Sequence, residues 1–447
     1  MLFKSKPLWI GLVGLTLLVN AAILFFLIPK ISVRLHSSYN QNEYADGYDQ
    51  LAANLAKGDG YRMYPDTAET IVREPGYPIL LAGIFILFGN NFTVVKLANL
   101  LLAFAAALLM MRIARRFSSG PVLILLSPLL FLFHPATLTA ESRGGSEVLF
   151  TFCLMVFLLT VYRAIENKRW RYYAGSGAAL GLTVLVKSTP ILFPLFLLAY
   201  LLVVERQGSR IAVCRNIVLM VVAMFVVLSP WIIRNYRLTG KFIPTATVMG
   251  ISAHAGLYDN THVSGDNSWA MADRDGARVR RKIAQELGYP FKDVQNSYYQ
   301  DFYSTNDEVK FSNYLFKAVV REYEKSPMLY VRCVSSNLFN LWFRGKTTTA
   351  TMMNVVVQAP YLILSILGLV LSIIDKQVRE AVPMALLIIY LTAVYVAILA
   401  QARYSVPLIP YLSILACITL VAARERLVAK IERRTLGSPR GPAVSTP

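Results

Sequence analysis

Two carboxylates in the stretch that follows the first apolar run have the chemistry of catalytic groups. In YADGYDQLAANLAKGDGY, apolar side chains recur at helical spacing and predict a short surface helix over 46–57. On a helical wheel Asp46 points away from the apolar stripe, and Asp49 lies at its flank. One interpretation is that Asp46 caps this helix and Asp49 favours its positive end. The other is that a carboxylate at the boundary between water and lipid acts as general base for an incoming hydroxyl or amine.

A second candidate group lies in SRGGSEVLFTF, at the head of a later apolar run. Glu147 begins that run and is expected to face protein or a polar cavity, because a carboxylate in hydrocarbon is costly. Arg143 stands four residues earlier, so an interfacial salt bridge between the two is one interpretation. The other is that both residues belong to a reaction centre.

Four basic residues stand at the predicted outer ends of apolar runs, where basic residues are expected to be rare. They are Arg73, Lys187, Arg234 and Arg403. Each of them by itself could extend to lipid headgroups. Together they predict an anion site, and a guanidinium binds phosphate through a planar fork of donors. A phosphate at this depth is expected to belong to a lipid, whose tail stays in the bilayer while its head reaches the site.

The sequence shows no pattern for a metal or a soluble nucleotide. The four histidines lack ligand spacing, and only His254 and His262, with Asp259, are close together. The four cysteines are far apart, without C-x-x-C spacing. A P-loop, a Gly-rich dinucleotide turn and G-x-S-x-G are also missing. We therefore expect no metal and no cofactor.

The elements that must position these residues are membrane helices. The chain has 447 residues, of which 55% are hydrophobic, and its mean hydropathy is +0.49. These values predict an all-α polytopic membrane protein. Basic loops on one face account for much of the formal charge of +19, so no nucleic-acid partner is expected. Ten candidate spans follow: 8–28, 92–111, 120–138, 147–164, 172–188, 190–204, 216–233, 353–374, 381–399 and 405–422.

One apolar run, residues 77–88 in REPGYPILLAGIFILFGNN, is too short to be a span. It reaches about 18 Å as a helix, against a hydrocarbon core of about 30 Å. If this run does not cross, the Lys- and Arg-rich loops all fall on the side of the N-terminus; if it crossed, MRIARRF and ENKRWRYY would face outward. We therefore expect a surface helix over 77–88, cytoplasmic termini and an inner-membrane location.

This topology divides the chain into six parts. A first helix is followed by an outer segment with surface helices at 46–57 and 77–88, and helices two to seven lead to a second, helical outer segment. Three further spans and a basic cytoplasmic tail complete the chain. The predicted boundaries are 1–28, 29–91, 92–233, 234–352, 353–422 and 423–447.

The order of these motifs resembles a known family. REPGYPILLAGIFILFG, SRGGSEVLFTF, LSPWIIRNYRLTGKF and RYSVPLIPY follow an acidic segment with Y-x-x-L-A-x-N-L. This order is similar to that of the type-C glycosyltransferases, in the branch of the dolichyl-phosphate-mannose protein mannosyltransferases and the bacterial aminoarabinose transferases that modify lipid A. The resemblance implies the type-C (GT-C) fold, with two juxtamembrane helices in the first outer loop.

The resemblance also implies roles for the acidic sites. In the family, a carboxylate on the first juxtamembrane helix is the catalytic base, which corresponds best to Asp46. The family's acid stands two residues further from the helix tyrosine, so Glu43 and Asp49 are rival bases. The Ser-Arg-x-x-x-acid pattern implies substrate-positioning roles for Arg143 and Glu147.

The implied function is inverting transfer of a sugar from a polyprenyl-phosphate donor on the outer, periplasmic face. The predicted donor contacts are Arg73, Tyr77, Lys187, Arg234 and Arg403. The acceptor class stays open between lipid A, another glycolipid, a polysaccharide and a protein, with membrane lipids as surroundings. Two other classes of function compete with this one: a transporter or flippase of lipid-linked saccharide, and an assembly protein that binds a partner through its outer helices.

Overall fold

The structure is a computed structural model in which almost all regular elements are helices. It describes residues 6–30, 44, 46–204, 209–262, 268–292, 301–345 and 347–436. Within these ranges the regular strands are β1 (Phe291–Lys292) and β2 (Asp301–Phe302), which pair antiparallel. Glu43 lies outside the described residues.

Seven helical elements in the described chain are long and apolar enough to cross a membrane. They are α1 (Lys6–Ala22) with the π-turn η2 (Ile23–Leu27), α5 (Phe92–Ala114), α8 (Glu147–Asn167), α11 (Arg210–Thr239), α16 (Thr348–Ile374), α17 (Val378–Ile398), and η4 (Ala402–Leu408) with α18 (Ile409–Leu436). An eighth is counted if α6 (Pro121–Leu132) and α7 (Pro135–Glu141), bent by 56°, form one broken span. The bend lies at His134, because proline disfavours helical backbone in the preceding residue.

Two of the ten predicted spans are not among these seven or eight candidates. The stretch 172–188 forms α9 (Trp170–Val186), and 190–204 forms η3 (Thr189–Leu192) with α10 (Phe193–Val204). The 17 residues of α9 reach about 25 Å. α9 packs closely on α11, because a Cβ on Gly177 would lie 2.0 Å from the Met220 carbonyl oxygen. That α9 and α10 cross a membrane stays a prediction.

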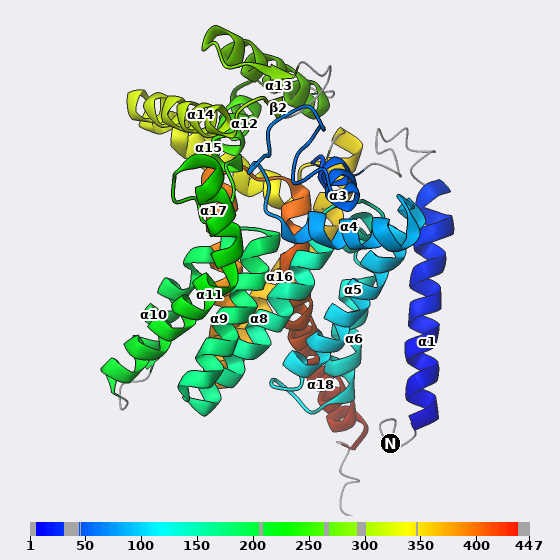
Figure 1. Ribbon diagram of the computed structural model, residues 1–447. Coiled ribbons are helices and arrows are strands. Elements are labelled where there is room, and N and C mark those ends of the chain that lie inside the picture. Colours follow the sequence, from blue (N-terminus) through cyan, green and yellow to red (C-terminus); the bar gives the residue numbers. More distant parts are fainter. Residues whose placement is uncertain are drawn as a thin grey trace, which may run out of the picture.

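The two short helices of the first predicted outer segment lie at one end of this bundle. α3 (Tyr48–Lys57) packs on α4 (Gly76–Phe88), with the Tyr48 and Tyr77 rings edge to face at 5.1 Å. Figure 1 shows α4 lying across the bundle end, next to the top of α5. One face of α4 is buried, while Ile86, Leu87 and Phe88 are exposed. An apolar helix with an exposed apolar face suits a position in the membrane surface.

The second predicted outer segment forms a helical unit at the same end, which we call the α3–α4 end (Figure 1). It contains α12 (Val248–His262), α13 (Ser268–Glu286), the two strands, α14 (Thr305–Lys325) and α15 (Pro327–Trp342). Its core includes Phe302 and Phe311 and also takes in Tyr61 and Val72 from the loop 58–75 between α3 and α4. The unit therefore holds the loop that carries Arg73.

Candidate active site

Asp46 is the centre of a charged cluster at the α3–α4 end. Its backbone is left-handed, with φ of +62°, and Gly47 follows with φ of +71°. Gly47 is the N-cap of α3, and no side chain caps the helix. The expectation that Asp46 caps a helix over 46–57 is therefore wrong. The left-handed pair turns the Asp46 carboxylate away from the helix end and toward two arginines.

Two guanidinium groups share the Asp46 carboxylate. Arg403 donates from Nη1 to Oδ2 at 3.1 Å and from Nη2 to Oδ1 at 3.2 Å, and Arg73 Nη2 lies 3.1 Å from Oδ1. The Asp46 side chain is 18% exposed. Arg403 therefore binds as a two-pronged fork, and Arg73 adds a third contact.

The electrostatics of this cluster favour the ionised form of Asp46. Burial by itself would raise the Asp46 pKa, but the positive charges of Arg403, Arg73 and Lys187 outweigh it and hold the pKa below its ordinary range. Burial would lower the pKa of Arg73, but Asp46 and other neighbours raise it. Both partners are therefore charged near neutral pH, and Asp46 is a weak base while the arginines hold it.

Glu147 and Lys187 lie at the edge of the same cluster. Glu147 Oε1 is 3.7 Å from Arg403 Nη1, and its side chain is 7% exposed. Lys187 Nζ lies 4.4 Å from the centroid of the Tyr404 ring. Arg73, Lys187 and Arg403 contribute three positive charges, and Asp46 and Glu147 contribute two negative ones; the buried Glu74 adds a third negative charge that acts on Arg73. Cations and carboxylates are therefore balanced, and an incoming anion has to compete with the carboxylates for the arginines.

The turn that carries Arg73 is held by contacts that the sequence reasoning missed. Glu74 is buried, and its Oε1 accepts a hydrogen bond from the Ser188 backbone N–H at 3.0 Å. The Tyr61 hydroxyl donates toward the carbonyl oxygens of Arg73 and Glu74, at 3.2 and 3.1 Å. Gly76 lies so close to the Leu185 carbonyl that a Cβ would be 2.8 Å away. The motif REPGYP contains Glu74 and Gly76, so the sequence could have indicated these contacts. They hold the turn that brings Arg73 close to Lys187.

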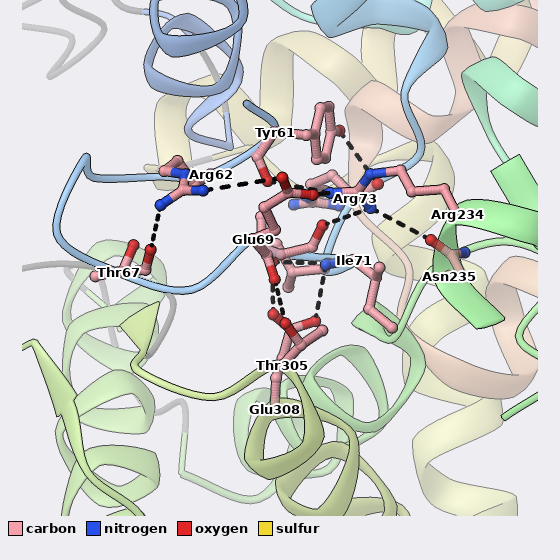
Figure 2. Close-up of polar contacts among 12 residues, drawn as sticks. Tyr61, Arg62, Thr67, Glu69, Ile71, Arg73, Arg234, Asn235, Thr305 and Glu308 are labelled. Carbon is pink, nitrogen blue, oxygen red and sulfur yellow. Dashed lines mark hydrogen bonds and ion pairs between the residues drawn. The ribbon is translucent and has the colours of Figure 1, made fainter. Parts of the chain in front are cut away.

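The sequence predicted Arg234 to be a phosphate ligand, but in the structure it lies in a second cluster of side chains. Its Nη2 pairs with Glu69 Oε2 at 2.8 Å, and its Nη1 donates to the Thr70 carbonyl at 3.2 Å. Its guanidinium also lies over the Trp231 and Tyr61 rings, at 4.6 and 5.3 Å. Figure 2 shows Arg234 held between Glu69, Tyr61 and Asn235. The sequence could not indicate that Arg234 forms an ion pair with Glu69.

Arg143 and Tyr77 are the remaining predicted site residues. Among the described residues, the ion pair of Glu147 is with Arg403; α8 begins at Glu147, and Arg143 precedes it. The Arg143 carbonyl accepts a hydrogen bond from Asn99 at 2.8 Å. Tyr77 is fully buried, its ring packs edge to face with that of Tyr48, and it forms part of the wall of the site.

Asp49 sits in the first turn of α3, apart from the cations. In the part of the chain that the structure describes it makes no ion pair, and burial raises its pKa. No group of three or more His, Cys, Asp and Glu side chains among the described residues is arranged to hold a metal ion. The arrangement around Asp46 can bind an anion through arginines, with a carboxylate beside it.

Comparisons with known proteins bear on the family and the fold of the chain. Residues 72–233 match the model of a family described as dolichyl-phosphate-mannose-protein mannosyltransferase. The matched region includes Arg73, Glu147 and Lys187, but Asp46 and Arg403 lie outside it. No curated protein sequence matches the chain.

Solved structures match over nearly the whole chain. The archaeal oligosaccharyltransferase AglB from Archaeoglobus fulgidus, in complex with an inhibitory peptide and a dolichol-phosphate, matches with a TM-score of 0.56 at 13% identity, over 98% of this chain and 53% of that one. The apo form of the A. fulgidus oligosaccharyltransferase gives 0.56 at 14% identity, over 97% and 53%. ArnT from Cupriavidus metallidurans, bound to undecaprenyl phosphate, gives 0.43 at 15% identity, over 98% and 82%.

The chain spans about half the length of the oligosaccharyltransferase that it matches. Sequence identity is low, so the similarity of structure establishes the fold. The resemblance and the fold class that the sequence predicted are confirmed. The chain has the type-C glycosyltransferase fold of a multi-pass membrane protein, and its region 72–233 matches the protein mannosyltransferase family.

Proposed function

We propose that this protein is a membrane glycosyltransferase that moves a sugar from a polyprenyl-phosphate donor to an acceptor, with inversion, at the α3–α4 end of the bundle. The acceptor is a hydroxyl or amine of a lipid, glycan or protein. The α3–α4 end faces the periplasm in this proposal, because the Lys- and Arg-rich loops then lie on the cytoplasmic side.

The observation that carries this proposal is the pair of guanidinium groups on Asp46. Arg73 and Arg403 come from segments 330 positions apart, yet both point at one carboxylate at the bundle end. Lys187 adds a third positive charge. A phosphate on a lipid tail meets such cations at the membrane surface, whereas a soluble donor would need a nucleotide site that the sequence lacks.

The donor phosphate would compete with Asp46 for the two arginines. Binding would draw Arg73 and Arg403 toward the phosphate oxygens and free the carboxylate, whose pKa would then rise toward its ordinary value. Asp46 would become a better base only in the presence of the donor.

The transfer step then balances in charge and atoms. The acceptor oxygen or nitrogen attacks the anomeric carbon and gives its proton to Asp46. The bond between the anomeric carbon and the phosphate oxygen breaks, and the electron pair leaves with the phosphate. The leaving group gains one negative charge, which Arg73 and Arg403 stabilise where it develops. Attack from the face opposite the phosphate inverts the anomeric configuration.

The test is sugar transfer by purified protein in lipid nanodiscs, with a panel of polyprenyl-phosphate sugars and membrane acceptors. We expect at least one donor to give a glycosylated product of inverted configuration. Asp46→Asn should lower turnover by about 10²- to 10⁴-fold, the usual range for a lost general base. Normal turnover in Asp46→Asn, with transfer lost in Asp49→Asn, would move the base to Asp49. A protein that binds every donor and transfers none would refute the proposed activity.

A further inference from the structure

The helix α15 buries amide side chains and exposes large apolar ones. Its buried residues are Cys333, Asn337 and Asn340, each at most 3% exposed, with Leu341 and Trp342 at its end. Its exposed side carries large apolar side chains that are between 47% and 66% exposed: Met328, Val331, Leu338 and Phe339. These four lie within about 100° of one another on the helical wheel; the exposed Ser335 lies among them, and its hydroxyl donates to the Val331 carbonyl at 2.9 Å. An apolar face of this kind marks a contact with lipid or protein.

Hydrogen bonds on the polar side fix the rotation of α15. The Asn337 amide donates from Nδ2 to the Val396 carbonyl at 3.0 Å and accepts at Oδ1 from Asn260 Nδ2 at 2.9 Å. Asn340 donates to Asn260 Oδ1 at 3.3 Å. Rolling the apolar face inward would break these bonds and leave buried amides unsatisfied, which is costly. The apolar face is therefore held outward.

The neighbours of α15 place it at the level where membrane-spanning elements begin and end. Val396 lies in the last turn of α17, and α15 also packs on η4, where the last span begins. The next helix along the chain is α16, a membrane-spanning candidate that starts at Thr348. In Figure 1, α15 lies beside α12 and α17, at the α3–α4 end of the bundle.

We propose that α15 is an interfacial helix whose face of Met328, Val331, Leu338 and Phe339 lies in the leaflet at the α3–α4 end. The membrane-spanning candidate α16, which contacts α15, also exposes large apolar side chains, including Met352, Met353 and Val356. The exposed side chain of Arg332, at the edge of this face, suits contact with a lipid phosphate. A lipid surface fits both the apolar face and this basic side chain. This inference does not depend on sugar transfer.

The lipid contact would also help to fix the position of the charged cluster that contains Arg403 and Asp46. α15 is bonded to the end of α17 and packs on η4, and η4 carries Arg403. A helix fixed in the interface thereby holds the turn from which Arg403 reaches Asp46.

The test is photocrosslinking with benzoylphenylalanine at Val331 and, separately, at Leu338, in the full-length protein in phospholipid nanodiscs. Val226, an exposed side chain on the membrane-spanning helix α11, is the positive control. Lys282, exposed on α13, is the negative control. Both test positions are exposed, so the larger side chain should be accommodated, which an unchanged Tm checks.

Mass spectrometry should find the mass of one phospholipid added at positions 331 and 338, with a yield close to that at 226 and several-fold above that at 282. Two results would overturn the proposal. The first is a crosslink to a second copy of the chain at both positions, which would make this face a dimer interface. The second is the absence of a lipid adduct at 331 and 338 while position 226 is labelled.

Discussion

Asp46 shares its carboxylate between Arg73 and Arg403, so an anion that binds these arginines has to displace it. The carboxylate is ionised because the neighbouring cations hold its pKa low. It therefore neutralises the site that a phosphate would occupy. At the scale of single residues, Asp46 is both the proposed base and the proposed competitor of the donor phosphate.

Asp46→Asn should therefore bind a polyprenyl phosphate more tightly while it loses transfer. Removing the competing charge leaves Arg73 and Arg403 free for the phosphate, and we expect an affinity increase of about tenfold, from hydrogen bonds to charged groups of about 1.5 kcal/mol. Scintillation proximity or microscale thermophoresis with the lipid phosphate measures this. Asp49→Asn is the matched control and should leave the affinity unchanged. Weaker binding by Asp46→Asn would contradict the competition.

The three arginines should separate into two classes when each is changed to alanine. Arg73→Ala and Arg403→Ala should weaken polyprenyl-phosphate binding by about ten- to a hundredfold, since each removes hydrogen bonds between charged groups. Arg234→Ala should leave this affinity within about threefold, because Arg234 is paired with Glu69, but it should lower Tm by loosening the loop 58–75. Equal loss of affinity in all three variants would show that Arg234 also binds the phosphate.

At the scale of elements, the loop 58–75 is fixed to the second outer segment by a buried acid. Glu308 on α14 accepts hydrogen bonds from the Thr70 and Thr247 hydroxyls, both at 2.5 Å, and from the Ile71 N–H at 3.3 Å. Thr305 adds a bond to the Glu69 carbonyl at 2.5 Å, and Figure 2 shows both α14 residues below the loop. The position of Arg73 therefore depends on α14, more than 230 residues further along the chain.

Glu308→Ala should lower the free energy of unfolding by about 2–4 kcal/mol, from three lost hydrogen bonds. Glu308→Gln keeps an acceptor for Ile71 and Thr247 and an amide donor for Thr70, so its loss should be smaller. Thermal unfolding in detergent measures both. Equal Tm values for the alanine variant and the natural protein would show that the loop is held elsewhere.

The pH dependence of stability should also change at Glu308. Burial raises its pKa in the folded protein, although its hydrogen bonds lower it in part. The group therefore adds stability below its ordinary pKa of about 4.3, and this contribution is lost as pH rises through the folded pKa. Glu308→Gln lacks this titration, so its Tm should rise relative to that of the natural protein as pH increases from about 4 to 8.

Two glycines of α9 offer a matched pair for the packing of the bundle. Gly177 touches α11 so closely that a Cβ would lie 2.0 Å from a carbonyl oxygen, whereas Gly175 has nothing within 4 Å. Gly177→Ala should destabilise by about 1–3 kcal/mol or more through overpacking. Gly175→Ala should be neutral or stabilising, since alanine favours helix by about 1 kcal/mol. Similar Tm values for the two variants would contradict the close helix contact.

At the scale of the whole molecule, the arrangement predicts which loops face the same side. Asp59, in the loop after α3, and Asn167, at the end of α8, are both exposed. In a Cys214→Ser background, Asp59→Cys should react with a membrane-impermeant maleimide in intact cells, and Asn167→Cys only after permeabilisation. Labelling of both from outside, or only of Asn167, would overturn the proposed topology.

Much of this architecture follows from composition and charge. Long apolar runs predicted the helices, because backbone groups in lipid must bond within their own segment. The run 77–88 was too short to cross, and α4 lies across the bundle end over nearly the same residues. The residue pattern also singled out Asp46, Arg73, Lys187, Glu147 and Arg403, which the structure brings into one cluster.

The sequence by itself thus determined the helical class, the short surface helix and the residue types available for chemistry. Only the tertiary structure decided which charges meet. Among the described residues, Arg234 pairs with Glu69, Glu147 pairs with Arg403, and Asp46 lies in a left-handed turn before its helix. Helical periodicity is local and can be read along the chain, whereas an ion pair depends on Coulomb energies over a few ångströms between segments hundreds of residues apart.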